Sequence, residues 1–128
     1  MISKNETKYI QSLFQKKKRD EEGVFVCEGV KLVQELIQSG FTVKRVYATQ
    51  GWADAHKEVL GNLTVVTETE LGKLSGLTTP NQVLAVVEKR TAPVNFLLQR
   101  RFTLMLDGIQ DPGNFGTMLR TADWFGVN

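Results

Sequence analysis

Four short apolar runs, separated by stretches with helical spacing, constrain the fold of the first ninety residues more than any other feature. The runs cover residues 24–27, 43–48, 63–66 and 83–87. Apolar runs of this length, rich in β-branched residues, are typical of buried strands. Because helix-like stretches lie between them, the pattern predicts an α/β sandwich with a parallel or mixed sheet.

Helix-start signals support the same pattern. Ser3 followed by Glu6, and Thr67 followed by Glu70, have the spacing of capping boxes. Gly40 stands where a helix that starts after Gly29 is expected to end. The predicted helices of this region cover residues 4–19, 30–37, 52–60 and 68–75.

A change in pattern near Pro93 predicts a domain boundary. Pro93 interrupts regular structure, and a strand pattern restarts at residues 103–107. We therefore expect a first domain over residues 1–92, a linker over 93–102 and a second unit over 103–128. One strand and one helix bury too little surface to fold alone, so the second unit is expected to be incomplete.

The residue types exclude several classes of site. Cys27 is the only cysteine and His56 the only histidine, so neither an internal disulfide nor a Cys/His zinc site is expected, and we predict no metal. Cys27 lies in an apolar run and is interpreted as a small buried hydrophobe rather than a nucleophile. His56 is expected to be a solvated helix residue. No apolar run is long enough to span a membrane and the N-terminus is unlike a secretory signal, so a cytoplasmic protein is expected.

The charge is small overall but uneven. The net charge of +2 does not by itself indicate nucleic-acid binding. Lys16, Lys17, Lys18 and Arg19, however, form a continuous basic run. Such a run can neutralise nucleic-acid phosphates, or it can be a solvated helix end whose cations suit the helix dipole. Composition alone leaves both interpretations open.

The last segment combines a turn-rich loop with an amphipathic helix. Residues 108–116 hold three glycines, but these match neither the dinucleotide fingerprint nor a Walker A loop, which disfavours nucleotide hydrolysis. Asn114 is predicted to be the N-cap of the helix and Gly126 to lie at its end. The predicted apolar face consists of Phe115, Met118, Leu119, Ala122 and Phe125.

The whole string from Leu106 to Gly126, LDGIQDPGNFGTMLRTADWFG, resembles motif 1 of the TrmH-type RNA methyltransferases of the SPOUT superfamily. Residues 25–37 and 79–87 are similar to the start and the end of the substrate-binding domain that precedes the catalytic domain in that family. The residues that match motif 1 are Asn114, Gly116, Arg120, Thr121, Ala122 and Gly126.

The resemblance implies an N-terminal three-layer α/β/α RNA-binding domain with a mixed sheet, followed by the first strand and helix of a knotted SPOUT domain. It implies methyl transfer from S-adenosylmethionine to a ribose 2′-hydroxyl of ribosomal or transfer RNA by a homodimer. The motifs that hold the cofactor in the family are expected downstream of Asn128. The alternative is an RNA-binding module that has no catalytic activity in this truncated form.

The resemblance also implies roles for single residues. Arg120 matches the catalytic arginine of the family, and we expect it to stabilise the alkoxide that develops on the ribose. Asn114 is expected to shape the catalytic loop by capping its helix, or to contact RNA or a neighbouring subunit. Residues 16–19 are expected to contact the RNA backbone.

Overall fold

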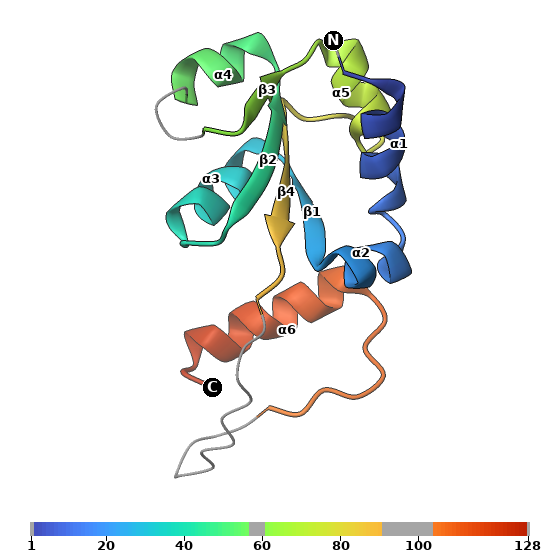
Figure 1. Cartoon of the computed structure of the whole chain (residues 1–128). Helices are drawn as coiled ribbons and strands as arrows, with labels where there is room; N and C mark the ends of the chain where they lie inside the picture. Colours follow the sequence, from blue (N-terminus) through green and yellow to red (C-terminus); the bar gives the residue numbers. More distant parts are fainter. Residues whose placement is uncertain (1, 57–60, 91–103, 128) are drawn as a thin grey trace. The chain divides into compact units, whose positions relative to one another are not determined.

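The computed structural model describes residues 2–56, 61–90 and 104–127 (Figure 1). The chain divides into two compact units, Met1–Thr91 and Ala92–Asn128, and each is described by itself. The predicted linker over residues 93–102 lies wholly outside the described residues, so the predicted domain limits stay predictions. In the first unit the elements follow one another as α1 (Lys4–Ser12), α2 (Lys16–Glu22), β1 (Val24–Glu28), α3 (Val30–Gln38), β2 (Val43–Ala48), α4 (Gln50–His56), β3 (Leu63–Val65), α5 (Glu68–Leu74) and β4 (Val83–Glu88).

The strands form one mixed sheet, in the order β1-β4-β2-β3. β4 lies between β1 and β2 and is antiparallel to both, whereas β3 is parallel to β2. Residues 83–87 of β4 are all buried, as a central strand covered on both faces requires. The predicted α/β class with a mixed sheet is confirmed.

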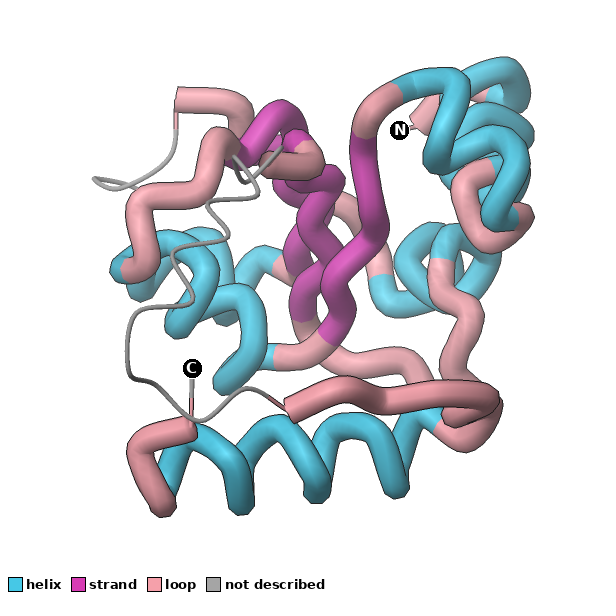
Figure 2. Tube along the Cα trace, turned by 90° about the horizontal axis from the view of Figure 1, so that it is seen from below, coloured by secondary structure: helices cyan, strands magenta, loops and turns pink. Residues whose placement is uncertain are grey.

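Helices cover both faces of this sheet (Figures 1 and 2). Successive side chains of a strand point to opposite faces, so the sheet contributes residues to two separate cores. Leu84 and Val86 of β4 pack with residues of α1 and α5, while Val83, Ala85 and Val87 pack with residues of α3 and α4. The predicted three-layer α/β/α arrangement is thus confirmed.

The two predicted capping boxes form to different extents. Thr67 Oγ1 accepts the backbone N–H of Glu70 at 3.1 Å, and a Glu70 carboxylate oxygen accepts the N–H of Thr67 at 2.9 Å. Ser3 Oγ accepts the N–H of Glu6 at 3.1 Å, but the Glu6 carboxylate accepts the hydroxyl of Tyr47 instead of completing the box. In the second case a tertiary contact replaces half of a local motif.

The predicted single helix over residues 4–19 is wrong, since the structure has two helices separated at Leu13–Gln15. Leu13 is fully buried, and Gln15 has an extended backbone. The Arg19 guanidinium donates to the carbonyls of Leu13 and Phe14, which satisfies the end of α1 and allows the chain to turn into α2.

Cys27 and His56 differ in how well they were predicted. Cys27 is buried as predicted, and its burial, together with the neighbouring Glu28 carboxylate, raises the pKa of the thiol to about 11. His56 is half-buried rather than solvated: its ring stacks on Trp52 at a centroid distance of 4.1 Å, and its Nδ1 lies 2.8 Å from the Trp52 carbonyl. The predicted helix over 52–60 is present as far as His56, and residues 57–60 lie outside the described part.

The second unit contains α6 (Pro112–Trp124). Gly126 lies at the end of this helix, as predicted, and its backbone is left-handed. The strand predicted over 103–107 is not found at residues 104–107, because a strand needs a hydrogen-bonded neighbour and the described residues provide none. None of the helices in the described ranges has the length and apolar character that crossing a bilayer requires.

Candidate functional site

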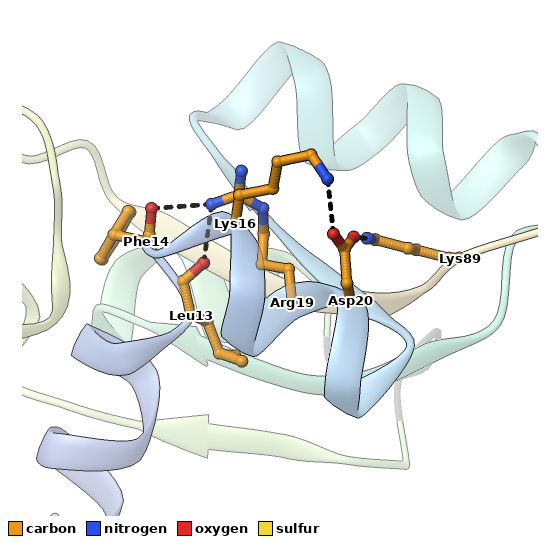
Figure 3. Close-up of polar contacts among 6 residues, drawn as sticks. All are labelled: Leu13, Phe14, Lys16, Arg19, Asp20 and Lys89. Carbon is orange, nitrogen blue, oxygen red and sulfur yellow. Dashed lines mark hydrogen bonds and ion pairs between the residues drawn. The ribbon is translucent and has the colours of Figure 1, made fainter.

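Arg19 of the predicted basic run has a structural role. Its Nη1 donates to the carbonyl oxygen of Leu13 at 3.0 Å and to that of Phe14 at 2.8 Å (Figure 3). These carbonyls lie at the negative end of α1, where a cation is favourable. The guanidinium is half-buried and committed to the backbone, so it is the least available of the four predicted phosphate contacts.

The Asp20 carboxylate contacts two lysines that are far apart from each other in sequence (Figure 3). Lys16 Nζ lies 2.6 Å from one carboxylate oxygen of Asp20, and Lys89 Nζ contacts the other oxygen. Hydrogen bonds from Lys16 and then from Lys89 lower the pKa of the Asp20 carboxyl to about 2, so the carboxylate is ionised at neutral pH. Lys89, which lies just after β4, was missed by the sequence analysis because it has no local connection to α2.

The remaining two cations of the run differ in their partners. Lys18 Nζ pairs with Glu22 at 2.8 Å and with Glu21 at 3.7 Å, and the hydrogen bond and charge of Glu22 raise the pKa of Lys18. Lys17 is exposed and forms no ion pair within the described residues. The structure therefore places residues 16–19 on one short helix, but it leaves only Lys17 fully open to a ligand.

The opposite end of the sheet carries polar groups that mainly hold the fold. The Glu28 carboxylate accepts the N–H of Gly76 at 3.0 Å and the hydroxyl of Ser75, which joins β1 to the end of α5. A cleft of about 190 Å³, lined in part by Thr49, Asn81 and Gln82, lies beside it. This volume is below the ~300 Å³ at which small-molecule sites usually begin, so the cleft alone does not indicate a ligand.

The predicted N-cap of α6 is wrong, because Asp111 and not Asn114 caps the helix. The Asp111 carboxylate accepts the backbone N–H of Asn114 at 2.6 Å, and Pro112 occupies the first helical position. Proline suits this position because its fixed φ is helical and its missing N–H would have no partner there. The helix therefore begins three residues earlier than expected, and the Asn114 side chain is not used for capping.

Arg120 and Asn114 lie on different faces of α6. They are six positions apart along the helix, which corresponds to about 9 Å along the axis and about 120° around it. Arg120 is exposed and forms no hydrogen bond or ion pair within the described ranges. The helix presents these two side chains separately and does not bring them into one site by itself.

α6 also presents an apolar groove of about 490 Å³ together with the preceding loop and the residues that follow the helix. Of the predicted apolar face, Met118, Ala122 and Phe125 line this groove. Phe125 is 75% exposed and the neighbouring Trp124 is 85% exposed. Contiguous exposed apolar surface of this kind marks an interaction surface in soluble proteins.

Known proteins are similar in sequence to residues of both units. The sequence profile of the MRM3-like substrate binding domain matches residues 4–85. The chain is 32% identical over 121 residues to the 23S rRNA (guanosine(2553)-2′-O)-methyltransferase RlmP of Bacillus subtilis, an alignment that covers 92% of this chain and 47% of the relative.

Solved structures extend the similarity over the full chain. A TrmH-family protein from Porphyromonas gingivalis is 35% identical, with a TM-score of 0.84, and the match covers 100% of this chain and 51% of that one. An AdoMet-bound rRNA methyltransferase from Sinorhizobium meliloti is 32% identical, with a TM-score of 0.78, over 99% of this chain and 51% of that one. The chain spans about half the length of these relatives.

Because the matched profile covers well over half of the 128 residues, the chain belongs to the MRM3-like substrate binding domain family, and its relatives are methyltransferases of the TrmH type.

Proposed function

We propose that the chain is the substrate-binding domain and motif 1 segment of an S-adenosylmethionine-dependent methyltransferase that modifies a ribose 2′-hydroxyl of ribosomal or transfer RNA. One observation carries the proposal: the similarity does not stop at residue 85, where the family profile ends, but continues through α6. This continued similarity supports the proposal that a motif 1 segment follows the substrate-binding domain.

The described residues do not fit S-adenosylmethionine by themselves. The cofactor supplies a methyl group and carries polar groups that need hydrogen-bond partners. The groove beside α6 is mainly apolar, and the hydroxyls of Thr117 and Thr121 donate to carbonyls of their own helix at 3.0 Å and 2.9 Å. The proposed cofactor site therefore lies downstream of Asn128.

Arg120 is the proposed catalytic residue. A ribose hydroxyl is a poor nucleophile until its proton is lost or shared, and a guanidinium stays charged at neutral pH and is a poor base. The proposed role is to hold the hydroxyl and to stabilise the negative charge that develops on its oxygen while the proton passes to water or to an RNA phosphate. The absence of internal partners for Arg120 in the described part of the chain supports this role, since its donors are available.

Further contacts are proposed for the other predicted residues. The side chain of Asn114 is proposed to contact RNA or a neighbouring subunit, because capping is performed by Asp111. Lys17, with Lys16, is proposed to contact the RNA backbone. Lys18 and Arg19 are proposed to stabilise α2 and its junction with α1 rather than to bind phosphate directly. Lys18 already pairs with a carboxylate, and Arg19 already donates to backbone carbonyls.

The proposed assembly is a homodimer that acts in the cytoplasm. The exposed apolar surface of α6 supports an assembly, because Phe125 and Trp124 would be buried in it. Sedimentation of the protein extended to its natural stop codon tests this part of the proposal, with a monomer at micromolar concentration as the contradicting result.

The activity is tested by transfer of labelled methyl groups from S-adenosylmethionine to total RNA, again with the protein extended to its natural stop codon. Ribose-linked label is expected. Arg120→Ala is expected to lower kcat about 100- to 1000-fold, the range for loss of one donor to a developing oxyanion. Arg120→Lys keeps the charge but loses the planar donor fork, and Asp123→Asn on the same helix serves as the matched control with unchanged activity.

Retained activity in Arg120→Ala would discard the proposed mechanism but keep the enzyme class. The alternative, an RNA-binding module, is favoured by the mainly apolar lining of the groove beside α6, where the Thr117 and Thr121 hydroxyls already bond within the helix. Tight RNA binding without label in any RNA pool would establish this alternative.

A further inference from the structure

The cluster of Lys16, Asp20 and Lys89 contains a carboxylate in a position that suits a phosphate. Lys16 comes from α2, and Lys89 follows the central strand of the sheet, yet both ammonium groups converge on Asp20 (Figure 3). Carboxylate and phosphate oxygens accept charge-assisted hydrogen bonds of the same kind from ammonium groups. The two lysines that surround the Asp20 carboxylate are therefore also placed to bind a phosphate.

Stability gives little reason for this arrangement. The side chains of Lys16, Asp20 and Lys89 are 82%, 46% and 35% exposed. Ion pairs at this exposure are screened by water and salt and contribute little to folding. What Asp20 changes is the charge available at the surface, because one carboxylate and two ammonium groups leave a net charge of +1 instead of +2.

The other cations near this end of the sheet are committed elsewhere. Arg19 donates to the carbonyls of Leu13 and Phe14, and Lys18 pairs with two glutamates of its own helix. Arg90 donates to the Gly40 carbonyl and lies 4.1 Å from the centre of the Phe41 ring. Lys44 pairs with Glu88 at 3.1 Å. Among the described residues at this end of the sheet, Lys17 and the two partners of Asp20 are therefore the cations that remain for an approaching anion.

We propose that an RNA backbone phosphate binds between Lys16 and Lys89 in the complex, and that Asp20 occupies this position in the free protein. Asp20 thereby limits sequence-independent RNA binding. The proposal rests on the proposed RNA-binding function and adds the residue that regulates it. On binding, the flexible lysine stems transfer their ammonium groups from the carboxylate to the phosphate. A substrate-binding surface gains from such restraint, because non-specific backbone contacts otherwise hold the wrong RNA as tightly as the right one.

The position of the cluster along the chain suits this role. Val24 of β1 pairs with Glu88, so the start of β1, the end of β4 and α2 share one end of the sheet. Lys89 is also two residues before Thr91, the last residue of the first unit. RNA held by Lys89 is therefore bound close, along the chain, to the connection with the motif 1 unit.

The test compares Asp20→Asn with Glu35→Gln in the 128-residue chain. Both substitutions remove one exposed negative charge, but Glu35 lies on α3 and has no polar side-chain partner within the described residues. Binding of an unstructured uridine oligomer is measured by fluorescence anisotropy over a range of salt concentrations. Thermal unfolding of each variant verifies that the fold is intact.

Asp20→Asn is expected to bind the oligomer about 5-fold more tightly at 0.1 M salt for each lysine that no longer has to leave the carboxylate, since one lysine–phosphate contact with a single strand corresponds to about 0.7 in the salt slope. Glu35→Gln is expected to change the affinity less than about twofold, because its charge is screened from the cluster. Adding Lys16→Ala and Lys89→Ala to Asp20→Asn is expected to remove the gain. Equal gains in Asp20→Asn and Glu35→Gln, or a gain that survives loss of both lysines, would overturn the proposal.

Inorganic polyphosphate, which has phosphates but no ribose or bases, separates this proposal from the proposed function. Tighter polyphosphate binding by Asp20→Asn, with no RNA bound or methylated by any variant, would support the phosphate site and contradict the RNA function. Normal RNA methylation by the extended protein, with RNA and polyphosphate affinities unchanged in Asp20→Asn, would contradict the phosphate site and keep the function.

Discussion

Replacing Tyr47 by phenylalanine tests how a polar network inside the first core contributes to stability. Tyr47 is fully buried in the core beneath α1, and its hydroxyl donates to a Glu6 carboxylate oxygen at 2.7 Å. Arg45 Nη1 donates to the same oxygen at 3.1 Å, so Glu6 keeps one charged partner after the substitution. A hydrogen bond to a charged group typically contributes about 1.5–3 kcal/mol, and we expect Tyr47→Phe to lower the free energy of unfolding at neutral pH by this amount.

The pH dependence of the stability difference between the native chain and Tyr47→Phe gives a second, independent value for the free energy that the Tyr47 hydroxyl contributes. Burial, and then the hydrogen bond to Glu6, raise the pKa of Tyr47 from 10.0 to about 12. Because the folded state holds the phenolic proton more tightly than the unfolded state, the contribution is fully present below pH 10 and is lost as the pH rises toward 12. Two pH units correspond to about 2.7 kcal/mol, so most of the advantage of tyrosine over phenylalanine is expected to disappear over this interval.

The measurement is urea unfolding of the native chain and of Tyr47→Phe at several pH values between neutral and strongly alkaline. All other ionisable groups are common to both proteins, so their contributions cancel in the difference. Two stability curves that converge above pH 10 are expected. A difference that stays constant up to pH 12 would refute the assigned burial and hydrogen bond of the Tyr47 hydroxyl.

Two further predictions concern other parts of the first unit. Arg19→Ala is expected to lower the free energy of unfolding, measured in urea, by about 1–3 kcal/mol, because the carbonyls of Leu13 and Phe14 lose a charged donor. Replacing the exposed Lys17 by alanine is expected to leave this free energy nearly unchanged. Equal effects of both substitutions would contradict the structural role of Arg19. Cys27 is expected to resist iodoacetamide in the native protein at pH 8 and to react readily in urea, because burial raises the pKa of its thiol to about 11; mass spectrometry that finds native labelling at the unfolded rate would contradict its burial.

The fold class and the order of the elements along the chain could be predicted because their signals are local. The β-branched run at 83–87 and the Thr67–Glu70 pair specify a buried strand and a helix start through neighbouring residues alone. The same holds for Gly40 and Gly126, whose left-handed backbone favours glycine. These parts of the prediction were correct or within about two residues.

The errors arose where distant contacts or competing local signals decide the structure. The break after α1 depends on Arg19 reaching back to Leu13, and the Lys89–Asp20 contact joins residues that are far apart in sequence. The helix start at Asp111 is a different case, because the Asp–Pro pair is itself a local signal for a helix start, although Asn114 was predicted as the cap. The site residues at 114 and 120 remain predictions, since the described part of the chain does not bring them together.

The central place of β4 has a consequence for how the protein is made. β4 is the last strand of the first unit to leave the ribosome, yet both β1 and β2 pair with it. Until residue 88 has been synthesised, β1 has no partner and its apolar side chains stay unprotected. Pairings between residues this far apart in sequence form slowly, because a long loop must close first. The first unit therefore depends on β4 to complete its folding, and chaperone binding to this unit should fall sharply once β4 has emerged.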